Sequence, residues 1–236
     1  MLGMPLDAVS LDEAAAWVLE ALRIGPSSDG PARLVVTLNP EIVDQAMSDR
    51  GLGEAVRHAD LVVADGVGVA WAARRQGIEL PGRVPGVDLV QRVLELGGDR
   101  VTAFLLGAKP GVAEAAAREV ERRFGTRVVG THHGYFGADE EAVCGEVAAS
   151  GAGLLLAGLG EGQELFLHRH ARELGATVMI GVGGTLDVLA GTVRRMPRWT
   201  TRLGLEWLFR VGLDPKRWRR LPRLWRYAML VLGRTG

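Results

Sequence analysis

Six short apolar runs, none with polar alternation, are the feature that most constrains how this chain can fold. Runs of this kind are typical of strands that are covered on both faces. Each run is followed by a turn and then by a stretch with helical periodicity. This alternation predicts an α/β fold, a Rossmann-like parallel sheet with helices on both faces. The runs are Leu34–Leu38, Leu61–Ala64, Thr102–Leu106, Arg127–Val129, Leu154–Ala157 and Thr177–Val182.

Charge divides the chain near residue 193. The whole chain is neutral, with 28 basic and 28 acidic residues. Residues 194–236 hold 12 basic and 2 acidic side chains, a net charge of +10, so residues 1–193 carry −10. The same segment contains four of the six tryptophans. We therefore expect an α/β domain over 1–193 and a basic, Trp-rich helical appendage over 194–236 that meets an anionic membrane surface.

Apolar residues in the appendage are spaced for short amphipathic helices. The first stripe recurs every four residues, at Trp199, Leu203, Trp207 and Val211. The second stripe follows Pro222 and consists of Leu224, Trp225, Ala228, Met229 and Leu232. Arginine-rich helices with tryptophan suit the headgroup layer of a bilayer. A helical hairpin packed on the domain's own core is an alternative that the periodicity leaves open.

Composition argues against several classes of protein. Cys144 is the single cysteine, which rules out an internal disulfide and indicates a reducing compartment. The histidines have no cysteine near them in the sequence, so a structural zinc site is not expected. The chain lacks both a run of 18 apolar residues and a secretory signal, and we therefore expect a cytoplasmic protein.

Candidate chemistry lies directly after the apolar runs, because ligands of an open parallel sheet bind beyond the carboxyl ends of its strands. Asp65 is the only acid placed directly at the end of a run, where a carboxylate can serve as a general base. Alternatively, Asp65 caps a helix that begins at Gly66. The other candidates are Thr37, Asn39, Gly107, Lys109, His133, Tyr135, Phe136, Gln163, Gly184 and Asp187.

Two familiar nucleotide or metal motifs are missing. The stretch Gly181-Val-Gly183-Gly184 departs from the dinucleotide-binding spacing, so it supports a nicotinamide site only weakly and also fits simple tight turns. No Asp-x-Asp occurs to hold a divalent cation. A diphosphate would therefore be met by backbone amides, side-chain donors and arginines.

Eight short segments together carry a resemblance to a known family. Each alone is a weak signal, but eight in order are specific. They are Thr37-Leu-Asn-Pro-Glu-Ile-Val, Ala64-Asp-Gly-Val-Gly, Arg83-Val-Pro-Gly-Val-Asp-Leu, Leu106-Gly-Ala-Lys-Pro-Gly, Gly134-Tyr-Phe, Gly160-Glu-Gly-Gln-Glu, Gly181-Val-Gly-Gly-Thr-Leu-Asp and Gly204-Leu-Glu-Trp-Leu-Phe-Arg. Over nearly its whole length the chain resembles the WecG/TagA/CpsF family of bacterial glycosyltransferases, glycosyltransferase family 26.

The resemblance implies an inverting, metal-independent enzyme without a cofactor. It would move N-acetylmannosamine or a related sugar from a UDP donor to the 4-hydroxyl of N-acetylglucosamine on undecaprenyl diphosphate, in the synthesis of a cell-wall or surface polysaccharide. By position, Asp65 becomes the catalytic base, with Thr37 and Asn39 beside it. The residues expected around the donor nucleotide-sugar are Tyr135, Gln163, Asp187, Gly107 and Gly184.

The family also has a C-terminal appendage thought to touch the membrane, with arginines spaced by seven and then three. Arg210, Arg217 and Arg220 reproduce this spacing, which keeps helical side chains within about 80° of one another. Together with Arg83 at the pocket mouth, they would bind the lipid diphosphate. The chain departs from many relatives at Glu161-Gly162, where those relatives place Pro-Lys, so an anion replaces a cation near the expected diphosphate.

Two other functions stay open. One is a nicotinamide-dependent Rossmann oxidoreductase. The other is a nucleic-acid-binding protein that uses the basic, Trp-rich appendage. The charge of −10 on residues 1–193 would repel nucleic acid, so we expect no nucleic-acid partner. We expect a UDP-sugar, a polyprenyl-diphosphate-linked acceptor and the inner face of the cell membrane, where the protein would be peripheral. A homo-oligomer is a further option, because a domain whose appendage leaves it would expose apolar surface.

Overall fold

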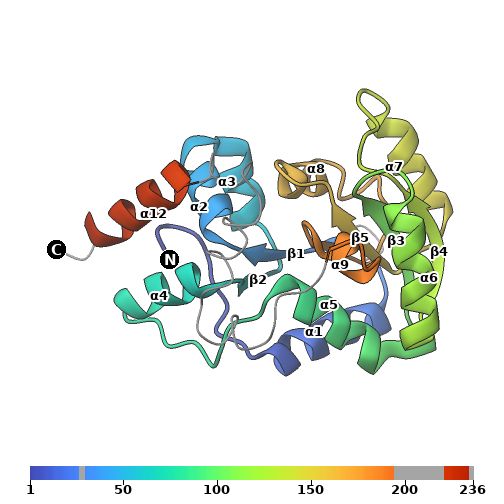
Figure 1. Cartoon of the computed structure of the whole chain (residues 1–236), viewed down its shortest axis with the longest axis horizontal. Coiled ribbons are helices and arrows are strands. Elements are labelled where there is room, and N and C mark those ends of the chain that lie inside the picture. The colour runs from blue at the N-terminus through green and yellow to red at the C-terminus, as the bar shows by residue number, and fades with distance from the viewer. Residues whose placement is uncertain (27–29, 194–220, 234–236) are drawn as a thin grey trace.

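The structure, a computed structural model, describes residues 1–26, 30–193 and 221–233. Its centre is a six-stranded sheet in which every neighbouring pair is parallel, in the order β2-β1-β6-β5-β3-β4 (Figure 1). The predicted Rossmann-like α/β fold is confirmed, and each of the six apolar runs forms a strand. The strands are β1 (Arg33–Leu38), β2 (Leu61–Ala64), β3 (Thr102–Gly107), β4 (Arg127–His132), β5 (Leu154–Gly158) and β6 (Val178–Gly181).

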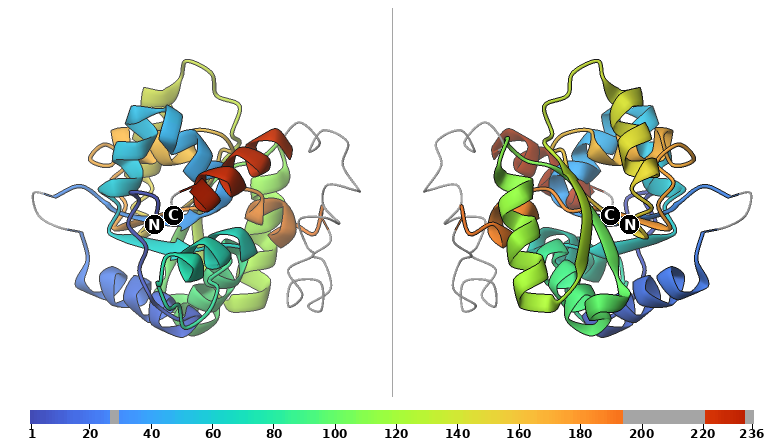
Figure 2. Two further views of the ribbon diagram at one scale, coloured as in Figure 1. Left: turned by 90° about the vertical axis from the view of Figure 1, so that its left-hand side faces the viewer. Right: turned by 90° about the vertical axis from the view of Figure 1, so that its right-hand side faces the viewer.

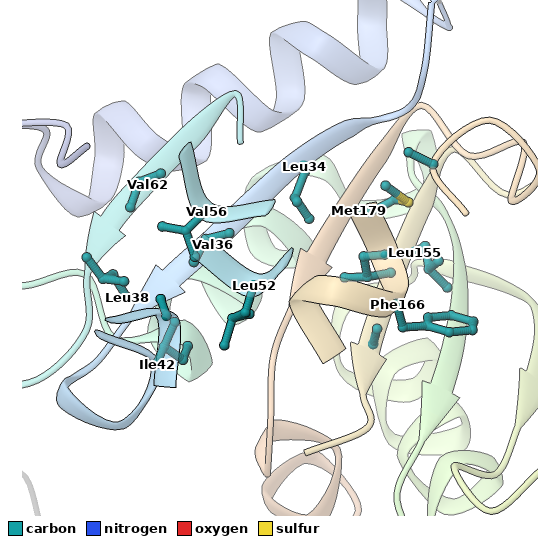
Figure 3. Packing of buried hydrophobic residues seen from close by; sticks show 14 of the residues in the cluster. Leu34, Val36, Leu38, Ile42, Leu52, Val56, Val62, Leu155, Phe166 and Met179 are labelled. Carbon is teal, nitrogen blue, oxygen red and sulfur yellow. The ribbon is translucent and has the colours of Figure 1, made fainter. Parts of the chain in front are cut away.

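Strand side chains alternate between two hydrophobic clusters, one on each face of the sheet, because successive residues of a strand point to opposite faces. Along β1, Leu34 and Val36 enter the first cluster and Val35 enters the second. Figure 3 shows the first cluster, in which Ile42 and Phe166 pack beside the strand residues. The helices that contribute buried residues to it are α2 (Pro40–Ser48), α3 (Arg50–Arg57), α4 (Val67–Arg75), α7 (Glu140–Ala149), α8 (Gln163–Arg169) and α12 (Leu221–Gly233).

The second cluster is closed by the helices on the opposite face. Their Ala, Val and Leu residues recur at helical spacing, and each helix lays that stripe on the sheet. A short 3-10 helix, Gly98–Arg100, links the end of α5 to β3. The helices are α1 (Leu11–Ile24), α5 (Gly86–Gly97), α6 (Val112–Phe124) and α9 (Thr185–Leu189).

The two edges of the sheet differ in how they are covered. At β2, the N-terminal segment covers the edge: the Asp7 N–H donates to the Val62 carbonyl at 2.8 Å, and the Val62 N–H donates to the Asp7 carboxylate at 2.7 Å. At β4, no residue is fully buried. Val129 packs against the first cluster and Val128 against the second, so β4 is covered on both faces as expected, and it is only partly buried because it lies at the edge of the sheet.

Helix α12 brings the end of the chain back onto the domain. It packs against α2, and Tyr227 and Val231 enter the first cluster. Three members of the predicted stripe, Trp225, Met229 and Leu232, are exposed instead. The alternative of packing on the domain's own core thus holds for one face of α12. The stripe from Trp199 to Val211 lies outside the described residues.

The part of the chain that the structure describes contains no helix long and apolar enough to cross a bilayer.

Candidate active site

The carboxyl ends of β1 and β2 bring Asn39 and Asp65 side by side. Leu38 pairs with Ala64 in the parallel register, and the Asp65 N–H donates to the Leu38 carbonyl at 2.9 Å. Asn39 directly follows β1 and Asp65 directly follows β2, so their backbones are about one strand spacing, ~4.8 Å, apart. Asp65 is half-buried. The N-cap of α4 is Gly66, one residue after Asp65, so the interpretation of Asp65 as the residue at the cap position is wrong.

Thr37 and Asn39 are already held by the fold, which limits what they can offer a ligand. The Thr37 hydroxyl donates to the Gly181 carbonyl at 3.0 Å, and its side chain packs against Gly86 at the start of α5. Thr37 could therefore only accept a further hydrogen bond. The Asn39 side-chain oxygen caps α2 by accepting from the Glu41 and Ile42 N–H groups at 2.9 and 3.0 Å. The Asn39 amide nitrogen is the part that this cap does not use.

Arg83 joins this group from the loop between α4 and α5. The N–H of the next residue, Val84, donates to the Ala64 carbonyl at 2.8 Å, which ties the loop to the end of β2. Arg83 is half-buried. The structure therefore brings Thr37, Asn39, Asp65 and Arg83 to one end of the sheet's carboxyl edge.

Gln163 and Glu164 form a second group, between β5 and β6. Both are buried at the start of α8. The Gln163 amide donates to the Glu164 carboxylate at 2.7 Å, and its oxygen accepts from the Gly183 N–H at 3.2 Å. Burial raises the pKa of Glu164, which the hydrogen bond from Gln163 only partly offsets. The pair fixes the turn after β6, where Gly184 is exposed and Asp187 is half-buried.

Close backbone packing explains the glycines at this edge. A Cβ on Gly107 would lie 2.4 Å from the Gly158 carbonyl oxygen, and one on Gly158 would lie 2.6 Å from the Gly183 carbonyl oxygen. No side chain fits at either distance, so the ends of β3 and β5 and the turn after β6 can approach this closely only because these residues are glycines. Gly107 therefore has a role in packing, and its role in binding the donor stays a prediction.

Tyr135 approaches the carboxyl edge from the side of β4. It follows β4, and its loop turns back over the ends of β3 and β5: the Gly134 N–H donates to the Ala108 carbonyl at 2.9 Å, and a Cβ on Gly134 would lie 3.3 Å from the Leu159 side chain. Its side chain is 68% exposed. The predicted donor residues therefore spread along the edge, with Gln163, Gly184 and Asp187 in the middle. Arg210, Arg217 and Arg220 lie outside the described residues.

A group of side chains with metal-ligand chemistry lies apart from these loops. Ligand atoms of Cys144, His170 and Glu173 are all within 4.8 Å of one another. Sequence spacing missed this group because α7 and the end of α8 meet only in the folded chain. The two His170 ring nitrogens are hydrogen-bonded to Glu173 at 2.6 Å and to Glu140 at 3.2 Å. Burial, with the nearby acidic charges, raises the pKa of the Cys144 thiol to about 11.

The stability of this region should depend on pH through His170. Burial works to lower the pKa of His170, but hydrogen bonds and charges from Glu173 and Glu140 outweigh it, so the pKa is raised. The stabilisation is then fully present below the unfolded pKa and is lost as pH rises through the folded pKa. We expect His170→Gln to lower Tm by about 2–4 °C at about pH 5.5, for about 1 kcal/mol, and by less at about pH 9. Glu173→Gln should remove most of the same pH dependence, and a pH-independent loss in both variants would contradict this account.

Sequence reasoning missed several residues around the edge. Glu164 is not predicted as a buried site residue because an acid in the first turn of a helix is normally exposed to solvent. Glu161, the departure from the relatives' pattern, pairs with Arg223 of α12 at 3.0 Å. Its negative charge thus has a partner in the appendage, a pairing that residues 62 positions apart do not signal.

The fold and the placement of these side chains define a class: a Rossmann-like α/β protein with polar groups along the carboxyl edge of a parallel sheet. Comparison with known proteins identifies the family within this class. The chain matches the glycosyl transferase WecG/TagA/CpsF family over residues 1–235 and belongs to that family. It is a glycosyltransferase.

Curated relatives agree with this membership. The chain is 35% identical over 192 residues, 80% of this chain and 74% of the relative, to N-acetylglucosaminyldiphosphoundecaprenol N-acetyl-beta-D-mannosaminyltransferase of Staphylococcus aureus strain NCTC 8325 / PS 47. The protein of the same name from strain MRSA252 is 34% identical over the same share of each chain. The resemblance found in the sequence is thereby confirmed, and it favours a glycosyltransferase over the nicotinamide-dependent and nucleic-acid-binding alternatives.

Proposed function

We propose that this enzyme transfers N-acetylmannosamine, or a closely related sugar, from a UDP donor to N-acetylglucosamine on undecaprenyl diphosphate. The observation that carries the proposal is the half-buried carboxylate of Asp65, in register with Asn39 and beside the Arg83 loop. The activity named for a relative that is 35% identical supports the choice of donor and acceptor.

In this mechanism the acceptor hydroxyl attacks the anomeric carbon of the donor while Asp65 takes up the hydroxyl proton. The bond from the anomeric carbon to the UDP oxygen breaks on the opposite face, so the configuration inverts. Orientation of the two substrates and proton abstraction each lower the barrier, the latter by about 10²- to 10⁴-fold in rate. Asn39 can donate to a sugar oxygen through its amide nitrogen, and Thr37 can accept from a sugar hydroxyl.

The donor would lie along the middle of the carboxyl edge, toward Gln163, Gly184 and Asp187. This stretch separates Asp65 from Tyr135, and an extended nucleotide-sugar suits such a span. The proposed leaving group is a diphosphate, whose charge would be met by backbone N–H groups and arginines instead of a metal ion. On the acceptor side, Arg83 is proposed to bind the lipid diphosphate together with Arg210, Arg217 and Arg220, because guanidinium groups make paired hydrogen bonds to phosphate.

We propose that the chain acts as a peripheral enzyme on the inner face of the cell membrane. The acceptor named for its relatives is carried on a lipid. Residues 194–236 carry a net charge of +10, which attracts anionic headgroups at about 1 kcal/mol per cation near the surface. Helix α12 presents Trp225, Met229 and Leu232 to solvent at helical spacing. In the absence of a membrane, this apolar face is open to a second copy of the chain, so self-association should compete with docking.

A donor screen tests the proposed function. Purified full-length enzyme is incubated with a short-chain polyprenyl diphosphate N-acetylglucosamine and, in turn, with UDP-linked N-acetylmannosamine, N-acetylglucosamine and glucose. We expect transfer of N-acetylmannosamine, unchanged by EDTA, with the new linkage inverted relative to the donor by NMR. Loss of turnover in EDTA would overturn metal independence. Turnover with none of these donors, combined with thermal stabilisation by NAD and not by UDP, would overturn the whole assignment.

A further inference from the structure

Helix α12 is bound to three segments at or near the carboxyl edge of the sheet. Arg226 pairs with Asp44 of α2, Tyr227 bonds to Gly68 in the first turn of α4, and Arg223 pairs with Glu161 before α8. Figure 1 shows α12 beside α2 and α3, and Figure 2 (left) shows it lying across the molecule above α4. Two of these segments begin beside candidate residues: α2 starts directly after Asn39, and α4 starts two residues after Asp65.

The contact between α12 and α2 is a bidentate salt bridge from Arg226 to the buried acid Asp44. The Asp44 side chain is 3% exposed, and its two oxygens lie 2.7 and 2.8 Å from Nε and Nη2 of Arg226. A carboxylate this deeply buried is costly unless it is paired and hydrogen-bonded. Since Asp44 lies on the helix that Asn39 caps, the pair joins α12 to the element that begins at Asn39.

The contact with α4 is made by the hydroxyl of Tyr227. This side chain is 3% exposed, and its hydroxyl donates to the Gly68 carbonyl at 3.0 Å. Burial raises the pKa of Tyr227 well above its usual range, so the hydroxyl stays protonated and remains a donor. Gly68 lies three residues after Asp65, in the first turn of α4.

Helices α2, α4 and α12 meet at Gly68. A Cβ built there would lie 2.6 Å from Cγ of Pro40 and 3.7 Å from Cε1 of Tyr227. Pro40 directly follows Asn39, so the first turns of α2 and α4 touch each other, and Tyr227 closes over their contact. The position of Asp65 relative to Asn39 is therefore linked to how α12 is seated.

We infer that Tyr227 is a positioning residue for sugar transfer: through its hydroxyl bond to Gly68 it holds the turn that carries Asp65. The inference rests on the proposed function, in which Asp65 is the base. It adds a role for α12 that needs no contact between this helix and either substrate. A base displaced by about 1 Å can lose about 10²-fold in rate, so a single hydrogen bond that restrains this turn has a measurable effect.

Tyr227→Phe in the full-length enzyme tests the inference, because it removes the hydroxyl and keeps the buried ring. With the short-chain acceptor, we expect kcat to fall about 3- to 10-fold, the range of one hydrogen bond, with the KM for the UDP-sugar unchanged. The matched control is Thr102→Val, which removes a hydroxyl that accepts from the Gly153 N–H at 3.0 Å at the amino end of β3. That control should leave kcat unchanged. A kcat for Tyr227→Phe within about 1.5-fold of the parent would overturn the inference.

Hydrogen exchange supplies a readout that does not require turnover. In Tyr227→Phe, amides of residues 65–72 should exchange faster, while those of α1 should not change. If the parent enzyme transfers no sugar, the substrate assignment fails, yet the exchange experiment still decides whether Tyr227 restrains this turn. Unchanged exchange over residues 65–72 would overturn the restraint itself.

A second set of variants keeps the test open if Tyr227→Phe folds poorly. Arg226→Gln leaves Asp44 buried without its cation and should lower kcat with the same unchanged KM. Adding Asp44→Asn restores a neutral, hydrogen-bonding pair and should recover at least half of the lost kcat, as expected if seating of α12 and not charge is what matters. No recovery, together with a parental melting temperature, would contradict the link between α12 and Asp65.

Discussion

Asp65→Asn is expected to lower kcat for sugar transfer by about 10²- to 10⁴-fold, the usual contribution of a general base. Asparagine keeps the shape of the side chain but cannot take up the proton of the attacking hydroxyl. Binding of the UDP-sugar should change by less than about threefold, because the residues proposed to bind the donor lie along the edge toward β6 and β5. The measurement is initial rate against donor concentration with a soluble, short-chain acceptor.

The matched control is Asp99→Asn, an exposed acid at the amino edge of the sheet, just before β3. It should retain parental kcat. A rate for Asp65→Asn close to that of the parent would remove Asp65 as the base and would direct attention to Glu164, the buried acid near the middle of the edge. Equal melting temperatures for both variants would show that any loss of rate is not a loss of folding.

Replacing the exposed stripe of α12 is expected to detach the enzyme from membranes. In the triple variant Trp225→Ser, Met229→Ser and Leu232→Ser, the loss of about 1 kcal/mol of burial per side chain lowers vesicle binding about 100-fold. The assay is co-flotation with vesicles of anionic phospholipid. Turnover of the short-chain soluble acceptor should stay within about threefold of the parent, because these side chains lie on the face of α12 opposite Tyr227.

Ile24→Ser combined with Leu96→Ser provides the control for that experiment. Both side chains are exposed, on α1 and α5, which lie away from α12 in Figure 1. This control should bind vesicles as the parent does. Parental flotation of the triple variant would show that α12 does not dock, and residual binding that disappears at high salt would assign the remainder to the basic residues of the appendage.

Local sequence pattern was sufficient for the strands and for the position of Asp65. A buried strand needs a run of apolar residues and a turn after it, and both depend only on residues that are adjacent in the sequence. The runs that begin at Leu34 and Leu154 could therefore be recognised without knowledge of any tertiary contact. The order of the strands could not be read in this way. It depends on the helices that cross between strands, and β6 lies between β1 and β5 although it is the last strand in the chain.

Helix α12 shows why a helix can be predicted while its buried face cannot. Apolar residues surround most of its circumference, so Trp225 and Met229 were as plausible in the core as Tyr227 and Val231. The surface of α2, with Asp44 placed to receive Arg226, selects the face that is buried. The glycines show the converse: Gly107 looked suited to a phosphate, but only the folded chain reveals that the Gly158 backbone occupies the space beside it.

The sequence by itself determined the α/β class, the family and an acid at the end of a buried strand, because each of these is encoded in short segments. Tertiary structure alone decided that Glu161 meets Arg223 and that Tyr227 reaches Gly68. The physical reason is that burial and pairing are properties of two segments at once, and Tyr227 and Gly68, which are 159 positions apart, carry no local sign that they will meet.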